Sequence, residues 1–194
     1  MQEFYAISEL LALLVLEPRT GLMIALLAIG ACIDIRTYRI PNWLTFGGTA
    51  FALAYSVAVP FSPGHGFLWA IGGLTVGLLI MLPLYAMRVM GAGDVKLMAM
   101  AGAFLGTTDV FSAAVSTFIA GGVAAILFAV HRRVFRQMMG NIRTTAEMMI
   151  VSAATGVGAG SIDARKKSVG KLPYGVSIFV GTAGYVVARH FGFI

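Results

Sequence analysis

The sequence between residues 66 and 87 reads GFLWAIGGLTVGLLIMLPLYAM and carries no charged side chain. A helix needs roughly 20 apolar residues to cross the hydrocarbon core of a bilayer, so this stretch is long enough to span it. The whole chain of 194 residues is 59% hydrophobic and only 11% charged, whereas soluble domains carry about 25% charged residues. These observations predict an all-α, polytopic membrane protein.

Further apolar segments bring the predicted number of transmembrane helices to six. A short N-terminal segment, residues 4–16, is apolar but contains Glu9. We interpret it as an extra helix that packs on the bundle or lies at the interface, with a seventh span as the alternative. We expect one membrane-embedded domain, residues 1–194. The predicted spans cover residues of about 20–35, 43–60, 66–87, 94–106, 110–130 and 172–193.

The segment 94–106 is too short to span a bilayer without help from its polar flanks. Thr107, Thr108 and Asp109 are helix-capping types and separate it from the next span, which predicts a tight helical hairpin. The alternative is a re-entrant segment. That alternative would move the basic loop 131–171 to the other side of the membrane.

The basic residues decide which end of the bundle faces the cytoplasm. With six spans, Arg19 and Arg189 alone fall on one side, and the positive-inside bias makes the opposite side cytoplasmic. A re-entrant segment would destroy this asymmetry, so six spans are favoured. The net charge of +6 therefore reflects orientation, and no nucleic-acid partner is expected. The cytoplasmic set is Arg36, Arg39, Arg88, Lys96, Arg132, Arg133, Arg136, Arg143, Arg165, Lys166, Lys167 and Lys171.

Two of the eight acidic residues stand out by their position. Asp34 lies at the cytoplasmic end of the first span and Asp94 at the cytoplasmic start of the fourth. An ionisable group at a membrane edge is a functional candidate, because it costs free energy unless it faces water or a partner. The alternative is that each aspartate pairs with a neighbouring Arg36 or Lys96. Asp109 falls in an external turn, where helix capping explains it.

Two neighbouring carboxyl groups can supply a general base and a general acid. In a low-dielectric cleft they do not both ionise readily, so they share a proton. The ionised group takes a proton from an attacking water, and the protonated group donates to the oxyanion or leaving nitrogen of a peptide. Gly91 and Gly93 precede Asp94, which would let a substrate backbone approach and permit unusual dihedrals. This chemistry needs no metal and no cofactor.

Three motifs together resemble the prepilin peptidase family. The stretch Asp34-Ile-Arg-Thr-Tyr-Arg-Ile-Pro-Asn42 is similar to the family's first catalytic motif, and Gly91-Ala-Gly-Asp-Val-Lys96 to its second. Leu172-Pro-Tyr-Gly175 is similar to the stretch that opens the family's last helix. The resemblance implies removal of the leader peptide from type IV or Flp-type prepilins at the cytoplasmic membrane face. It also implies that Asp34 and Asp94 are the catalytic pair.

Neighbours of the pair are candidates for supporting roles. Lys96 and Arg36 would stabilise the ionised carboxylate or contact substrate, and ordinary positive-inside anchoring is the alternative. Asn42, with Pro41, would shape the turn into the second span. Trp43 and Trp69 are expected to be interface anchors. The supporting set is Gly91, Gly93, Lys96, Arg36 and Asn42.

The chain also departs from the larger prepilin peptidases. Its single cysteine, Cys32, provides no pair for their cytoplasmic zinc domain, so N-methyltransferase activity is not expected. The compact form resembles the short peptidases of tight-adherence (Flp) pilus systems in the bacterial inner membrane. A presenilin-like or preflagellin-type protease and a small proton-coupled transporter are alternatives. In the loop 131–171, residues 135–151 fit either a membrane-surface helix or a solvated connector.

Overall fold

The computed structural model describes residues 18–59, 66–87, 89–131, 140, 147 and 173–193. The predicted N-terminal helix 4–16 and most of the loop 131–171 lie outside these residues. The chain divides into two compact units, residues 1–121 with 173–194 and residues 122–172. Every contact discussed below lies within the first unit.

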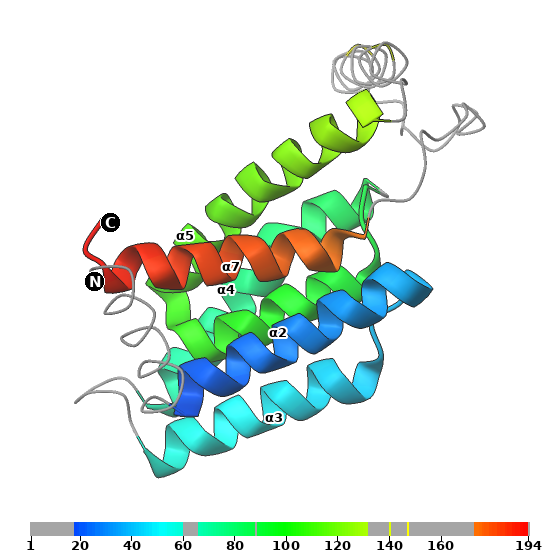
Figure 1. The fold of residues 1–194 in the computed structure, drawn as a ribbon. Coiled ribbons are helices and arrows are strands. Elements are labelled where there is room, and N and C mark those ends of the chain that lie inside the picture. The colour runs from blue at the N-terminus through cyan, green and yellow to red at the C-terminus, as the bar shows by residue number, and fades with distance from the viewer. Residues whose placement is uncertain are drawn as a thin grey trace. The chain divides into compact units, whose positions relative to one another are not determined.

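The described residues form helices and no strand (Figure 1). All helix bounds lie within a few residues of the predicted spans, and the segments predicted at 94–106 and 110–130 form a single element. The helices are α2 (Pro18–Thr37), α3 (Asn42–Ala58), α4 (Phe67–Ala86), α5 (Ala92–His131) and α7 (Tyr174–His190).

Three helical stretches are long and apolar enough to cross a membrane. They are Pro18–Thr37, Phe67–Ala86 and Ala92–Phe128. The α3 and α7 helices have 17 residues each, at the lower end of the usual span length. The structure thus shows an all-helical membrane protein, whereas the count of six spans and the extra N-terminal helix stay predictions.

The α5 helix is interrupted at Gly106, whose backbone has φ 80° and ψ −178°. This region of dihedral space is open essentially to glycine alone. In a straight helix Gly102 and Val110 would lie about 12 Å apart along the axis. Here a Cβ on Gly102 would lie 3.0 Å from Cγ2 of Val110, so the chain folds back. The hairpin is present, and its reversal uses Gly106, just before the predicted break at Thr107.

The first half of α5, residues 92–106, forms the centre of the bundle. From Asp94 to Gly106 every residue is buried except Lys96, which is partly buried. Small residues on the surrounding helices allow this close packing: Gly30 of α2 faces Leu97, Gly48 of α3 faces Met100, and Gly73 of α4 faces the backbone of Gly102. A helix of about 22 Å suffices at this position because protein, not lipid, surrounds it.

The α7 helix runs beside α2 in the opposite direction (Figure 1). It also packs against the second half of α5, where Gly181 faces the backbone of Thr117. As a result, the C-terminal end of α2 lies next to the N-terminal end of α7. This arrangement positions the site described next.

Candidate active site

Asp94 lies in the first turn of α5, which begins at Ala92. The backbone N–H of Gly91 donates a hydrogen bond to Oδ2 of Asp94, at 3.0 Å. An acidic side chain at the third helical position that reaches back to the N-cap N–H is half of a capping box. The positive end of the helix dipole also favours a carboxylate there. The local sequence Gly-Ala-Gly-Asp therefore holds Asp94 in a defined orientation.

Asp34 lies in the last turn of α2 and is held by a different helix. The backbone N–H of Gly175, in the first turn of α7, donates to Oδ2 of Asp34 at 2.8 Å. The N–H groups of a first helical turn have no partner within their own helix, so they form a natural binding place for an anion. Asp34 occupies that place.

The two carboxylates lie at the same end of the bundle, and their charges interact. The side chains are buried, with exposed fractions of 5% for Asp34 and 9% for Asp94. Both hydrogen bonds use Oδ2. Within the described residues no group donates to Oδ1 of either aspartate, which leaves that oxygen for water or a ligand.

Gly93 lies in a close contact with Ile40, where a side chain would be tight. A Cβ on Gly93 would lie 3.1 Å from Cβ of Ile40 and 3.4 Å from its backbone nitrogen. Gly91 lies close to the carboxylate that it binds, because a Cβ there would lie 3.4 Å from Oδ2 of Asp94. Among the described residues, positive φ angles occur at Tyr38, Gly106 and Gly192. The expected unusual dihedrals at Gly91 and Gly93 are therefore absent, and close packing of the two motifs explains Gly93 instead.

Lys96 connects the second motif to the first. Its Nζ donates to Oδ1 of Asn42 at 2.9 Å and lies 5.1 Å from the ring centre of Phe46. Asn42, expected to shape the turn into the second span, is the first residue of α3 and accepts this hydrogen bond. Arg36 is exposed and, within the described part of the chain, forms no ion pair with Asp34 or Asp94. The alternative in which basic neighbours neutralise the aspartates is therefore wrong for these residues.

The structure adds two residues that the sequence-based site did not include. Gly175 holds Asp34, and a Cβ at Gly175 would lie 3.0 Å from Oδ2 of that aspartate. Tyr174 is half-buried and interacts electrostatically with Asp94. The signal was present in Leu172-Pro-Tyr-Gly175, but only the packing of α7 against α2 shows what it does.

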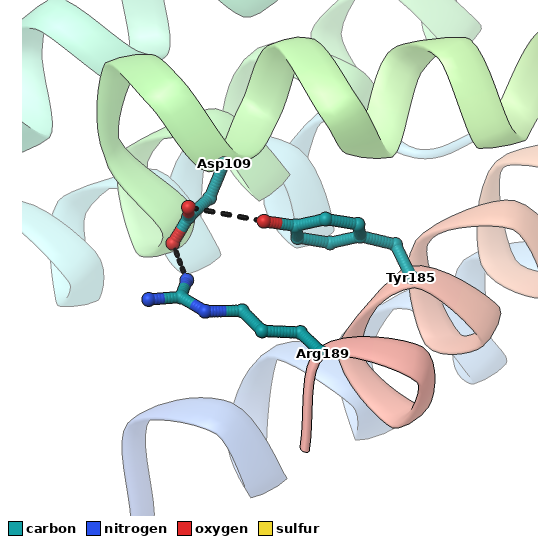
Figure 2. A network of polar contacts seen from close by, with 3 residues as sticks. All are labelled: Asp109, Tyr185 and Arg189. Carbon is teal, nitrogen blue, oxygen red and sulfur yellow. Dashed lines mark hydrogen bonds and ion pairs between the residues drawn. The ribbon is translucent and has the colours of Figure 1, made fainter. Parts of the chain in front are cut away.

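Asp109 follows the break at Gly106, and its side chain pairs with residues of α7 where the sequence predicted a helix cap. Figure 2 shows its carboxylate between Tyr185 and Arg189 of α7. The Tyr185 hydroxyl donates to Oδ1 at 3.0 Å, and Arg189 forms an ion pair with Oδ2. The sequence placed both charges on one side of the membrane but could not show that they meet.

The described residues also bear on metal binding. No group of three or more His, Cys, Asp or Glu side chains that could hold a metal ion forms among them. The two aspartates are thus a pair of carboxylates whose partners are backbone N–H groups.

These features define a helical membrane protein with two buried carboxylates brought together at one end of the bundle. The model of the type IV leader peptidase family matches residues 21–130, more than half of the chain, and both aspartates lie within the match. The chain belongs to this family, and it is a protease of the leader peptidase type. No curated protein and no solved structure matches the chain.

Proposed function

We propose that this protein is an aspartic endopeptidase that removes the leader peptide of type IV or Flp-type prepilins, with Asp34 and Asp94 as the catalytic pair. The observation that carries the proposal is the convergence of two buried carboxylates from distant parts of the chain, each with an Oδ1 that accepts no hydrogen bond from the residues that the structure describes. A buried pair of like charges destabilises a fold. Its presence therefore favours a functional role over a packing role.

The geometry supports a simple division of labour. A water molecule between the carboxylates would lose a proton to the ionised aspartate as it attacks the scissile carbonyl carbon. The protonated aspartate would donate its proton to the carbonyl oxygen, which gives a tetrahedral gem-diol. When the gem-diol collapses, that aspartate takes a hydroxyl proton back, and the first aspartate passes the proton it took from water to the leaving nitrogen. The N–H groups of Gly91 and Gly175 hold the two Oδ2 atoms, so the reacting oxygens need little reorganisation.

The position of the pair supports cleavage at the membrane edge. Asp34 is in the last turn of α2 and Asp94 in the first turn of α5, so both lie at helix ends. A presenilin-like protease that cuts in the middle of the membrane would need its carboxylates further from those ends. We further propose six spans, with the break at Gly106 dividing α5 into two and with the aspartates at the cytoplasmic face, as the positive-inside bias indicates.

The finer assignment rests on the sequence. One cysteine offers no zinc domain of the kind found in the methylating prepilin peptidases, so the proposed activity is proteolysis without N-methylation in the bacterial inner membrane. The substrate is proposed to be a pilin-like precursor of the tight-adherence type. Lys96 and Asn42 are proposed to support the site by joining the two motifs.

The direct test is coexpression with a candidate prepilin and measurement of leader removal by gel mobility. Asp34→Asn and Asp94→Asn should each lower the cleavage rate by about 100-fold or more, because each removes an acid–base group. Asp109→Asn is the matched control, since it makes the same chemical change at an aspartate outside the pair. Normal processing by either of the first two variants would refute the assignment.

The transporter alternative is distinguished by a separate measurement. Reconstituted vesicles should show no ion uptake that depends on Asp34 or Asp94 if the pair is proteolytic. Uptake abolished by Asp34→Asn, in a protein that cleaves no prepilin, would favour transport instead.

A further inference from the structure

A second polar site lies at the other end of the bundle. A cavity of about 340 Å³ opens there between α2, α4, α5 and α7. Its residues include Arg19, fifteen positions before Asp34 on α2 and so about 22 Å away along the helix. The volume corresponds to several water molecules, and the cavity is separate from the aspartate pair.

Arg19 is the unusual residue of this cavity. Its side chain is only 6% exposed. Nη2 donates to Oγ of Ser56 at 2.8 Å and to the carbonyl oxygen of Ala103 at 3.2 Å. The guanidinium lies 4.5 Å from the ring centre of Trp69. Among the described residues, the two hydrogen bonds use one of the three guanidinium nitrogens, Nη2.

Among the residues that the structure describes, the remaining nitrogens of Arg19 have no acceptor. Nε and Nη1 are buried and make no hydrogen bond with these residues, although arginine offers donors on all three nitrogens. Unsatisfied buried donors of a charged group cost several times as much as a neutral hydrogen bond. A buried cation near the end of a membrane-spanning helix therefore favours an anionic or strongly accepting partner.

The described residues of the cavity wall do not supply that partner. Asp109 lines the same cavity but is already bound by Arg189 and Tyr185 (Figure 2). Among the lining residues that the structure describes, Arg19 and Arg189 are positively charged and Asp109 is negatively charged, so one positive charge is in excess when His190 is neutral. The remainder of the lining includes the apolar side chains of Phe104, Leu105 and Val186.

We propose that this cavity binds the phosphodiester group of a phospholipid, with Arg19 as the principal ligand. A phosphodiester carries one negative charge and accepts hydrogen bonds from the unpaired guanidinium nitrogens, which prefer such an acceptor. The apolar part of the lining suits the glycerol and the first acyl carbons. The site is independent of proteolysis and would anchor the end of the bundle opposite to the aspartates.

The test uses the full-length protein purified in a nonionic detergent and its thermal unfolding with added lipid. Phosphatidylglycerol should raise the unfolding temperature, because a ligand that binds the folded state stabilises it. Diacylglycerol, which lacks the phosphate, should not. Arg19→Gln should weaken the lipid dependence by about 10-fold or more in concentration. Arg39→Gln, which removes the same charge from an exposed position, should respond like the unmodified protein.

Other outcomes have equally clear meanings. An equal lipid response of Arg19→Gln and Arg39→Gln, or an equal effect of diacylglycerol, would overturn the proposal. Inorganic phosphate is tested in the same way. If it stabilises the protein through Arg19 and phosphatidylglycerol does not, the proposal that the bound phosphate belongs to a lipid is refuted. If Arg19→Gln shows no cooperative unfolding, Arg19→Lys replaces it. That variant keeps the charge but loses the planar group of donors, and an undiminished lipid response would contradict the proposal.

Discussion

The carboxylates of Asp34 and Asp94 accept hydrogen bonds from backbone N–H groups at the starts of two helices, and no basic side chain in the described part of the chain pairs with them. Helix N-termini stabilise negative charge without bringing a titratable or mobile partner into the site. Lys96 and Arg36 are the nearby cations in the sequence. Lys96 donates a hydrogen bond to Asn42, and Arg36 is exposed. At the scale of residues, then, glycines contribute to the site as directly as the charged groups do.

Gly175 provides the first prediction at this scale. Gly175→Ala would place a Cβ 3.0 Å from Oδ2 and 3.1 Å from Cβ of Asp34, closer than ordinary contacts, so the aspartate must shift. We expect leader cleavage to fall about 10-fold or more, since small displacements of catalytic groups are costly, with thermal unfolding changed much less. Gly184→Ala, on the same helix with open space around it, should keep full activity. Unchanged cleavage by Gly175→Ala would contradict this role.

The hydrogen bond between Lys96 and Asn42 provides the second prediction at the residue scale. If Lys96 acts by joining α5 to α3, Lys96→Met and Asn42→Ala should each lower the free energy of unfolding by about 1 kcal/mol. The double variant should lose little more than either single one, because both remove the same interaction. Chemical denaturation of the four proteins in detergent measures this coupling. Additive losses would show that Lys96 and Asn42 act separately.

At the scale of elements, the short central helix and its reversal are the main structural feature. Gly106 allows the chain to fold back because its φ of 80° is available to glycine. A Cβ there would also overlap the ring of Trp69. Trp69, expected from the sequence to be an interface anchor, thus packs between this turn and Arg19.

Gly106→Ala should therefore be among the most damaging single methyl additions in the protein. We expect a loss of at least about 2 kcal/mol in unfolding free energy, from backbone strain together with the overlap. Gly47→Ala is a suitable comparison, since Gly47 lies within α3 with nothing near its Cβ position. That variant should be neutral or more stable by up to about 1 kcal/mol. Thermal unfolding of the Gly106→Ala and Gly47→Ala variants in the same detergent measures the difference. Equal stability of the two variants would argue against strain at the turn.

At the scale of the molecule, the bundle has two chemically different ends. One holds the paired aspartates, and the other holds Arg19 and the Asp109–Arg189 ion pair. Orientation in the membrane decides which end meets the cytoplasm.

Cysteine labelling in intact cells tests the orientation. Starting from Cys32→Ser, the variants Arg39→Cys and Val59→Cys place one thiol before and one after α3, both at exposed positions. A membrane-impermeant maleimide should label the Val59→Cys protein in intact cells, and the Arg39→Cys protein only after permeabilisation. The opposite pattern would place the aspartates outside and refute the proposed cytoplasmic cleavage.

The sequence by itself determined that the protein is a helical membrane protein. It also gave close bounds for its helices and singled out Asp34 and Asp94 as the candidate functional residues. These follow from the length of apolar runs and from the high cost of charge at membrane depth, both of which are local properties. The tertiary structure decided that Asp34 meets Gly175, that Asp109 meets Arg189 and that Arg19 is buried. Those contacts join residues far apart in the chain, and in an almost uniformly apolar bundle the pattern of one helix does not reveal which neighbour it will face.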